Sequence, residues 1–333
     1  MDKETEQFIL PFFSVVIPVY NKEPHINRSI SSVLRQTFQD FELIVVNDAS
    51  TDKSLEEVKK FNDSRIRIFE RSMPGPGGYA ARNLGIKEAK AKWVVFLDAD
   101  DEWYKDHLEE LSQLIQQFQD SGLVSTSWNE IVAGRSAEAN LFRKSTNISK
   151  PISINYKEYL KTSIEIDMPF CASSLAIKKK ILLSVEGFPE GKARRGGDVD
   201  TWLRVMAIAR NAAWSPKISA IYHRDSVNMV TKTESFSAKW EKNTIDNLLK
   251  DEQDRETRKF LRKYCNKRIV YRYINTRLEG MSPKDRLLPN VFISYLNLKQ
   301  FLIVLASILP NRALILLNET GHFINHRILK RGQ

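Results

Sequence analysis

The chain has 333 residues, of which 42% are hydrophobic and 28% charged, and its formal net charge is +10. This composition is typical of soluble globular proteins, argues against intrinsic disorder, and allows one large core or two smaller ones. The two cysteines, Cys171 and Cys265, are too few for a disulfide framework or a cysteine-rich metal cluster, which favours a reducing compartment such as the cytoplasm. The N-terminal MDKETEQFILPFF lacks the basic start and long apolar run of a signal peptide, so we do not expect export by that route.

Strand-like and helix-like segments alternate over the first 130 residues. SVVIPVY (14–20) and FELIVVND (41–48) are short and rich in β-branched residues, as expected of strands covered on both faces. Apolar residues recur at helical spacing between them. The later segments, in chain order, are SLEEVKKF, RIRIF, YAARNLGIKEAK, WVVFLD, a helical stretch from His107 to Gln119, and LVSTSW. Such alternation predicts a parallel sheet wrapped by helices on both faces.

Polar residues follow three of these predicted strands. Tyr20 and Asn21 follow the first, Asp48 ends the second, and the triplet region 98–101 (DADD) follows the fourth. Ligands of parallel sheets bind beyond the carboxyl ends of the strands, so we expect these residues to converge on one crevice. Neighbouring carboxylates repel one another unless a cation lies among them, and a divalent metal ion is an economical partner. An Asp-x-Asp triplet alone is weak evidence, however, because a second one occurs at 198–200.

The second half of the chain is less regular. Residues 133–153 are polar and punctuated and are predicted to form a loop. A helix is expected from about Val199 to Arg210, a strand at AWSPKISAIYH (213–223), and helices beyond about residue 235. We therefore predict a first domain over residues 1–235, with halves at 12–131 and 154–230, and a helical, basic extension over 236–333.

Much of the positive charge lies near the C-terminus. Residues 255–277 contain nine Lys and Arg interleaved with apolar residues, which indicates a basic amphipathic helix. Such a helix could bind nucleic acid, or it could pack on the main domain and expose its basic face to solvent. No zinc-finger, homeodomain or RNA-recognition motif accompanies it. The segment 291–310 is apolar but interrupted by polar residues, so it is a poor spanning helix. Together with the tail INHRILKRGQ it favours either a helix on an anionic membrane surface or a packed C-terminal hairpin.

Two nucleotide-binding alternatives follow from the glycines. No phosphate-loop motif is present, but residues 75–80 match G-x-G-x-x-A, with Asp98 about 20 residues further on, as in NAD-dependent oxidoreductases. Pro74 and Pro76 separate these glycines from the preceding strand, and a ribose-binding acid needs no further carboxylates beside it. A nucleotidyltransferase would instead require a Gly-rich, Arg-bearing loop after the first strand, where the chain has YNKEPHIN.

Five ordered segments resemble the GT-A glycosyltransferases of family 2. They lie between about residues 12 and 230 and are SVVIPVYN, SISSVLRQTFQDFELIVVNDASTD, AARNLGI, WVVFLDADDEW and EGFPEGKARRGGDVDTWLRV. The chain departs from the usual family residues at Asn47, Ala49, Glu186 and Gly197, the last of which replaces the Glu that precedes the catalytic Asp. The resemblance implies an α/β GT-A fold with a mainly parallel central sheet, followed by a helical C-terminal extension.

The resemblance also implies roles on the donor side. A departing nucleoside diphosphate needs a hard dication with oxygen ligands, so Asp100, assisted by Asp98, is expected to bind Mn²⁺ or Mg²⁺. Asp101 is expected to cap the following helix. The expected nucleotide-sugar-binding residues are Pro18, Tyr20, Asp48, Arg82 and Asp98. Packing at a strand end, a turn or cap, and a simple ion pair remain the alternatives for Tyr20, Asp48 and Arg82 respectively.

On the acceptor side, Asp198 aligns with the family's catalytic base, although a helix N-cap is the alternative for this residue. Asp200 and Trp202 are expected to bind the acceptor. The resemblance implies an inverting enzyme of the hexosyl- or N-acetylhexosaminyltransferase type that moves one sugar from a nucleoside-diphosphate sugar, preferably UDP-linked. The expected acceptor is a glycan or lipid-linked glycan of surface polysaccharide synthesis. The expected location is cytoplasmic, peripheral on the inner leaflet, with no nucleic-acid partner.

Overall fold

The computed structural model describes residues 10–132, 134–138, 140–226, 237–278, 280–311 and 314. The strands are β1 (Phe13–Val19), β2 (Phe41–Asn47), β3 (Ile66–Glu70), β4 (Trp93–Phe96), β5 (Glu102–Trp103), β6 (Leu123–Val132), β7 (Arg135–Glu138), β8 (Ile152–Asn155), β9 (Leu175–Lys178) and β10 (Asn211–His223). The α-helices are α1 (Ile26–Leu34), α2 (Ser54–Lys59), α3 (Tyr79–Glu88), α4 (His107–Gln117), α5 (Leu141–Ser145), α6 (Tyr156–Glu165), α7 (Lys179–Ser184), α8 (Gly197–Ala209), α10 (Ala238–Asp251), α11 (Arg255–Leu278) and α12 (Leu298–Ala306). Short 3-10 turns are η1 (Pro76–Gly78), η2 (Ala172–Ser174), η3 (Leu288–Asn290) and η4 (Ile293–Tyr295).

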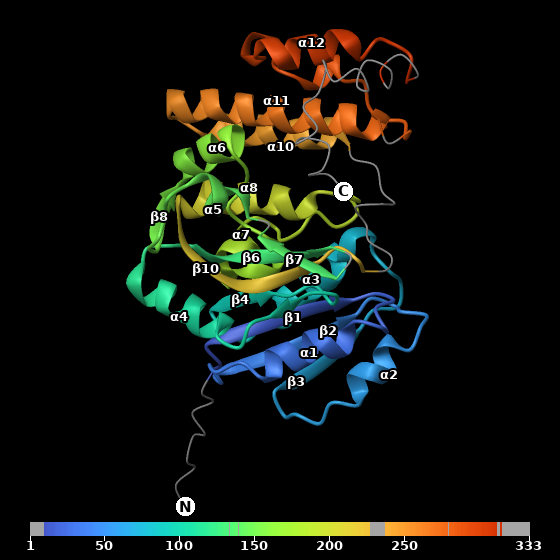
Figure 1. Ribbon diagram of the computed structural model, residues 1–333, viewed down its shortest axis with the longest axis vertical. Helices are drawn as coiled ribbons and strands as arrows, with labels where there is room; N and C mark the ends of the chain where they lie inside the picture. The colour runs from blue at the N-terminus through green and yellow to red at the C-terminus, as the bar shows by residue number, and fades with distance from the viewer. Residues whose placement is uncertain are drawn as a thin grey trace, which may run out of the picture.

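The strands form one mixed sheet in the order β3-β2-β1-β4-β9-β6-β10-β5, with β7 paired to β6 and β8 to β10 (Figure 1). β3, β2, β1 and β4 are parallel neighbours, and β10 is parallel to β6. β9 runs antiparallel between β4 and β6, so these two strands also share a direction. The predicted α/β fold with a mainly parallel central sheet is therefore confirmed.

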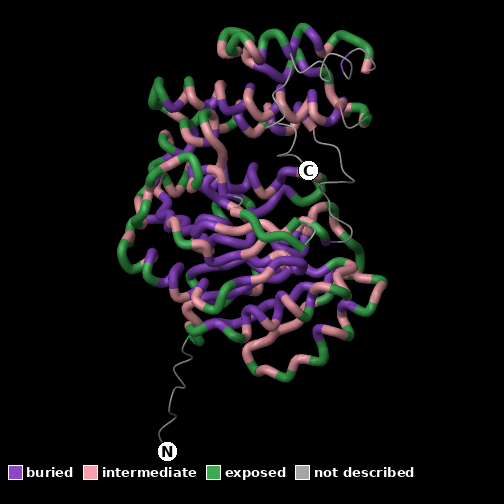
Figure 2. The backbone as a smooth tube through the Cα atoms, viewed as in Figure 1, coloured by how far each residue is buried: buried purple, intermediate pink, exposed green. Residues whose placement is uncertain are grey.

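Two apolar cores lie on opposite faces of this sheet. Along β1, Val15 and Ile17 belong to one core and Val16 to the other, as the two-residue period of a strand requires. The first core includes Ile30 of α1 and Leu111 of α4, and the second is covered by α3, α6 and α8. Figure 2 shows this buried interior as a continuous band through the sheet and its flanking helices.

The segment predicted as a loop at 133–153 is more ordered than expected, which corrects that prediction for its described residues. It contains β7, α5 and the start of β8. The Asn140 side chain accepts a hydrogen bond from the Arg143 N–H at 3.1 Å and so caps α5. Phe142 packs edge-on against Trp214 with ring centroids 4.8 Å apart. A cap and one aromatic contact order a stretch whose composition alone indicates a loop.

The described C-terminal residues form helices that pack on the second core. α11, the predicted basic amphipathic helix, buries Leu261 and Ile269 there, and its Lys267 donates to the Ser163 carbonyl of α6 at 2.7 Å. α12 lies on the outer side of α11 (Figure 1) and contributes Ile303 to the same core. A helix both long and apolar enough to cross a bilayer is not found in the described part of the chain. Residues 1–9, the end of the predicted acceptor half and the tail 324–333 lie outside the described residues.

Candidate active site

The carboxyl ends of three parallel strands meet as the sequence predicts. β1 lies between β2 and β4, so Tyr20 and Asp48 follow neighbouring strand ends, and the DADD segment begins two residues after β4. The Asp48 N–H donates to the Val19 carbonyl at 2.7 Å, which joins the ends of β1 and β2 directly. Asn21 adds a second link, because its side-chain oxygen accepts from the Thr51 N–H at 2.8 Å. The predicted convergence on one edge of the sheet is confirmed.

Asp48 is 1% exposed and its partners are distant in sequence. Its carboxylate pairs with the Arg71 guanidinium and accepts from the Gly75 N–H at 3.0 Å. The local cap or turn considered for this residue is not formed, because the N-cap position of α2 is Lys53. Arg71 was missed in the sequence, although it immediately follows β3 and the strand-end rule that selected Asp48 selects it too.

Pro18 and Tyr20 lie beside this ion pair. Pro18 is half-buried within β1. A Cβ placed on Gly78 would lie 3.6 Å from the Cβ of Pro18, so the glycine turn passes directly over this proline. Gly77 and Gly78 both have positive φ angles, of 70° and 65°, which permit this close turn before α3. The Tyr20 side chain is 42% exposed, which leaves its ring available as the wall of a pocket.

Arg82, on α3, is buried and joins the glycine turn to the Asp-x-Asp triplet. It donates to the Gly77 carbonyl at 2.8 Å and forms an ion pair with Asp98. Burial lowers the pKa of the Arg82 guanidinium, but the Asp98 carboxylate more than offsets this, and the pKa is raised overall. Of the two predicted roles, the ion pair is therefore formed in this structure.

The two other carboxylates of the DADD segment have different partners. Lys22 Nζ donates to Asp100 at 2.6 Å. Asp101 is fully buried and accepts from the Ser173 hydroxyl at 2.5 Å and from the His223 N–H at 3.0 Å. The expectation that Asp101 caps the next helix is wrong, because Asp106 occupies the N-cap position of α4. Burial, followed by the charges of Asp100 and Asp98, raises the pKa of Asp101.

The donor set at this edge suits a hard dication that is completed by a substrate. Among the described residues no three His, Cys, Asp or Glu side chains gather to hold an ion by themselves. Mg²⁺ and Mn²⁺ sites of the phosphate-transfer type need only one or two carboxylates, with the remaining ligands supplied by the substrate's phosphates and water. The carboxylates of Asp98 and Asp100 are oxygen donors of that kind, and they are paired here with Arg82 and Lys22. The residues present fit such a metal ion.

Asp198 lies in the first turn of α8, on the other half of the sheet. The N-cap position is Gly196, with φ +81° and no side-chain cap, so the capping alternative for Asp198 is contradicted. Burial raises the pKa of the Tyr79 hydroxyl, and the nearby Asp198 carboxylate raises it further. Asp198 also raises the pKa of Cys171, after burial and Asp101. Asp198 is therefore close enough to Tyr79 of α3 to influence its hydroxyl, and it lies at the positive end of a helix.

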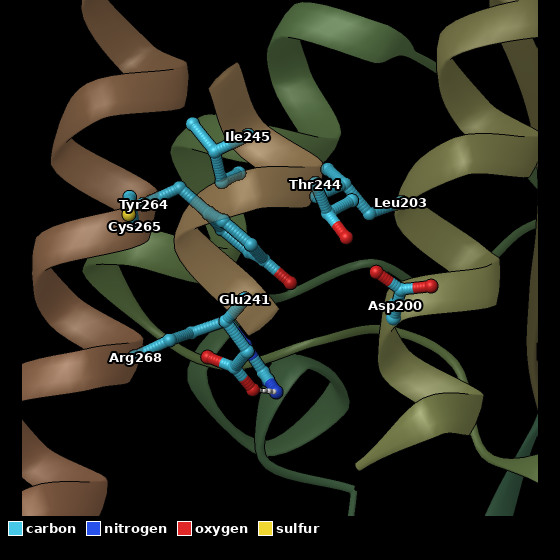
Figure 3. Close-up of a pocket in the computed structure, with 8 residues that line it drawn as sticks. All are labelled: Asp200, Leu203, Glu241, Thr244, Ile245, Tyr264, Cys265 and Arg268. Atoms are coloured by element: carbon cyan, nitrogen blue, oxygen red, sulfur yellow. Dashed lines mark hydrogen bonds and ion pairs between the residues drawn. The ribbon is translucent and has the colours of Figure 1, made fainter. Parts of the chain in front are cut away.

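Asp200 and Trp202, the two residues predicted to bind the acceptor, have partners other than those of Asp198. The Arg204 guanidinium donates to Asp200 at 2.7 Å, and Asp200 lines a cavity of about 10 Å³ between α8, α10 and α11 (Figure 3). Trp202 is 1% exposed and packs against Phe188 at 5.5 Å between ring centroids. The expectation that Trp202 contacts the acceptor is corrected, because its ring belongs to the core. For Asp200, acceptor binding stays a prediction.

Tyr79 is a further residue that sequence reasoning passed over. Its hydroxyl accepts from the Gly197 N–H at 2.8 Å, so the start of α3 holds the start of α8. A Cβ on Gly197 would lie 2.6 Å from the Tyr79 ring, which explains why glycine stands where the family has Glu. The sequence does show that Tyr79 begins the helix after the glycine turn. It does not show that the partner of Tyr79 lies 118 residues later.

This sheet, with carboxylates just after the two strands that flank β1 and a further carboxylate in the first turn of α8, is the arrangement of the GT-A sugar transferases. Comparison with known proteins gives the family. The family described as "Glycosyl transferase family 2" matches residues 14–183, just over half of the chain. The chain belongs to glycosyltransferase family 2. The oxidoreductase, nucleotidyltransferase and nucleic-acid-binding alternatives lose their support.

Relatives in sequence are partial matches. An uncharacterized glycosyltransferase of Rickettsia bellii is 36% identical over 197 residues, which are 58% of this chain and 26% of that protein. The UDP-Glc:alpha-D-GlcNAc-diphosphoundecaprenol beta-1,3-glucosyltransferase WfgD of Escherichia coli is 42% identical over 96 residues, 29% of this chain and 38% of that one. The chain thus spans about a quarter to two fifths of the length of these relatives.

Solved structures share the fold over most of the chain. TarS of S. aureus, residues 1–349 in complex with UDP-GlcNAc, superposes with a TM-score of 0.70 at 18% identity and covers 93% of this chain and 92% of that one. The mannosyltransferase PcManGT of Pyrobaculum calidifontis, in complex with GDP-Man and Mn²⁺, has a TM-score of 0.57 at 16% identity and covers 98% and 85%. The GT-A fold is established by these matches.

Proposed function

We propose that this protein is an inverting glycosyltransferase that moves one sugar from a nucleoside-diphosphate sugar, preferably UDP-linked, to a hydroxyl of a glycan or lipid-linked glycan in surface polysaccharide synthesis. The observation that carries the proposal is the convergence of Asp48, Asp98 and Asp100 just after β2 and β4, the two strands that flank β1, with the Asp198 charge acting on Arg82, the partner of Asp98. Two similar proteins support it: TarS was solved with UDP-GlcNAc, and WfgD is named as a glucosyltransferase from UDP-Glc to alpha-D-GlcNAc-diphosphoundecaprenol. A hexosyl or N-acetylhexosaminyl donor agrees with both names.

The base of the donor would bind at Asp48 and Arg71. A uracil imide presents one N–H between two carbonyl groups, so a carboxylate beside a guanidinium offers complementary hydrogen bonds. Pro18 and the half-exposed Tyr20 ring would form the adjoining wall of the base pocket. This arrangement supports uracil as the preferred base of the donor.

The diphosphate would lie over the DADD segment. Asp98 and Asp100 would hold Mn²⁺ or Mg²⁺, which supplies positive charge to the leaving group when bound. In this structure Arg82 pairs with Asp98 and Lys22 with Asp100. When a metal ion binds the two carboxylates, each of these basic side chains would be able to turn to a diphosphate oxygen.

The reaction would be a single displacement at the anomeric carbon. The acceptor oxygen forms the new bond to that carbon, the bond to the diphosphate breaks, and the hydroxyl proton passes to the Asp198 carboxylate. Asp198 supplies that carboxylate from the first turn of α8. Attack from the face opposite the diphosphate inverts the configuration.

The acceptor side would lie at a membrane surface. Leu298, Leu302, Leu305 and Ile308 form an exposed apolar stripe on α12 and the turn after it, with Leu298 76% and Ile308 83% exposed. Residues 312–333, of which the structure describes only Leu314, contain four Lys and Arg and one acidic residue. An apolar stripe followed by a basic segment suits anionic lipid. We therefore propose a cytoplasmic enzyme that is peripheral on the inner leaflet.

Donor binding tests this proposal. The purified protein is titrated by calorimetry with UDP-glucose, UDP-GlcNAc, UDP-galactose and GDP-mannose, with Mn²⁺ and with chelator. We expect one UDP-sugar to bind at least about tenfold more tightly with Mn²⁺, and Asp100→Asn to abolish that difference, because the amide cannot supply a charged ligand. Asp106→Asn is the matched control, since Asp106 also pairs with a lysine but lies outside the DADD segment. Binding of no sugar nucleotide, or equal binding in chelator, would contradict the proposal.

A further inference from the structure

The N-terminus of α8 is in direct contact with the C-terminal helix α11. A Cβ built on Gly196 would lie 2.2 Å from Nη1 of Arg272, 2.9 Å from Nη2 and 3.0 Å from the guanidinium carbon. Three atoms of one guanidinium therefore press against the Cα of the helix N-cap residue. Gly196 also has φ +81°, which side-chain-bearing residues rarely adopt. The turn that presents Asp198 is thus shaped on one side by a side chain from the extension.

Arg272 is fixed from behind by α10. Glu241, 7% exposed, accepts from Arg272 at 3.0 Å and from Arg268 at 2.7 Å through the same oxygen. Although burial raises the pKa of Glu241, the two guanidinium groups lower it overall, so this acid is a carboxylate. Figure 3 shows Glu241 and Arg268 together across the small cavity from Asp200. One carboxylate oxygen thus holds both guanidinium groups, and that of Arg272 lies against the start of α8.

The Asp198 carboxylate is close enough to Arg272 to influence its charge. Burial and the neighbouring Arg268 lower the pKa of Arg272, whereas the Glu241 and Asp198 carboxylates oppose the fall. On the opposite side the Tyr79 hydroxyl accepts from the Gly197 N–H at 2.8 Å. The two glycines before Asp198 are therefore clamped between a tyrosine of α3 and an arginine of α11.

We propose that Arg272 is a positioning residue of the transfer reaction, which holds the Gly196–Gly197 turn so that the Asp198 carboxylate faces the acceptor hydroxyl. The C-terminal extension is then a working part of the active site and not only a platform for a membrane or partner. This inference rests on the proposed function, because it assumes that Asp198 is the base. A lysine in place of Arg272 keeps the charge but not the flat fork that covers Gly196.

The test compares Arg272→Ala, Arg272→Lys and the matched control Arg268→Ala in the full chain. Arg268 shares Glu241, but the three side-chain atoms nearest to a Cβ on Gly196 all belong to Arg272. We expect Arg272→Ala to lower kcat on the order of 100-fold, with the KM for the donor nearly unchanged, because the base is misplaced while the strand-end site is intact. Arg272→Lys should recover part of the loss, and added guanidinium ion should partly rescue Arg272→Ala alone. Arg268→Ala should lower stability with kcat per folded molecule preserved.

A second measurement does not depend on sugar transfer. Hydrogen exchange of the backbone amides at residues 196–200 should speed up in Arg272→Ala and stay protected in Arg268→Ala, in which Arg272 keeps its bond to Glu241. Unchanged exchange and unchanged kcat in Arg272→Ala would overturn the positioning role. A wild-type protein that binds no sugar nucleotide would instead refute the proposed function, and the exchange result would still decide whether Arg272 holds the turn.

Discussion

Asp198 and Asp200 stand two positions apart on α8 and meet different surroundings. Asp198 follows the turn that faces α3, whereas Asp200 is buried and paired with Arg204. Burial raises the pKa of Asp200, and the Arg204 charge opposes that rise. Two positions on one helix turn therefore separate Asp198, which lies near Tyr79 and Arg82, from Asp200, which joins α8 to its neighbours.

Replacing Asp198 by Asn tests the proposed base. Asn has nearly the same shape but cannot accept a proton, so turnover should fall by about 10²–10⁴. Stability should be unchanged, because Gly196 already occupies the N-cap position and no side chain caps the helix. Initial rates on a lipid-linked acceptor and thermal unfolding measure the two effects.

Asp200→Asn is the contrasting variant. It leaves the Arg204 guanidinium with a weakened partner in a buried setting, so it should lower stability more than turnover per folded molecule. Near-normal turnover in the Asp198 variant would remove Asp198 as the base and make Asp200 the next residue to test.

At the scale of elements, α4 is joined to the sheet by a buried histidine. His107 stacks on Trp103 with ring centroids 4.3 Å apart, and its Nδ1 lies 2.7 Å from the Ser219 hydroxyl on β10. Burial lowers the pKa of His107 to about 3, with Asp106 opposing and Lys217 adding to the shift. The folded protein therefore keeps this ring neutral at pH values where the unfolded chain protonates it.

This difference predicts acid sensitivity. Below the unfolded pKa near 6.5 the unfolded state binds a proton that the folded state does not, so stability is complete above pH 6.5 and falls as pH decreases toward 3. At pH 5 the loss should be about 2 kcal/mol relative to pH 7.5. Denaturant unfolding at both pH values should give a smaller loss for His107→Gln than for the wild type. Equal losses in the two proteins would show that another group controls the acid response.

At the scale of the whole molecule, the C-terminal helix α12 has one apolar side packed in the core and another exposed to solvent. α12 buries Ile303 and Val304 against α11 while its opposite side exposes Leu302 and Leu305. The described part of this segment is therefore packed on the core, as the hairpin alternative requires, and membrane binding by its exposed side stays a prediction. Deleting residues 285–333 would remove part of the core, so point substitutions on the exposed side are the cleaner test.

Leu302→Asp combined with Leu305→Asp should weaken binding to vesicles that contain anionic lipid by about tenfold or more, since each buried leucine contributes roughly 1.5–3 kcal/mol. Both side chains are about half exposed, so folding should survive. Leu183→Asp on α7 is the matched control, because Leu183 is 55% exposed elsewhere. Co-sedimentation with anionic and with zwitterionic vesicles measures the effect. Equal binding by the double variant and the wild type would refute the membrane surface on α12.

Local patterns determined much of this protein. Runs such as SVVIPV and FELIVV are strands because β-branched residues fit a sheet covered on both faces, and parallel strands bring Tyr20, Asp48 and the DADD segment to one edge. The helix at 255–277 follows from its periodicity in the same way. These inferences need only residues close in sequence and one topological rule.

The tertiary structure decided what depends on partners far apart in the chain. Burial of Trp202 in the core, the pairing of Asp101 with Ser173, and the contact of Arg272 with Gly196 each join residues tens of positions apart. A sequence pattern fixes which face of an element is apolar, but it does not fix which distant side chain meets a given atom. For that physical reason the strand-end carboxylates were predictable, whereas the clamp on the helix that presents Asp198 appeared only in the folded chain.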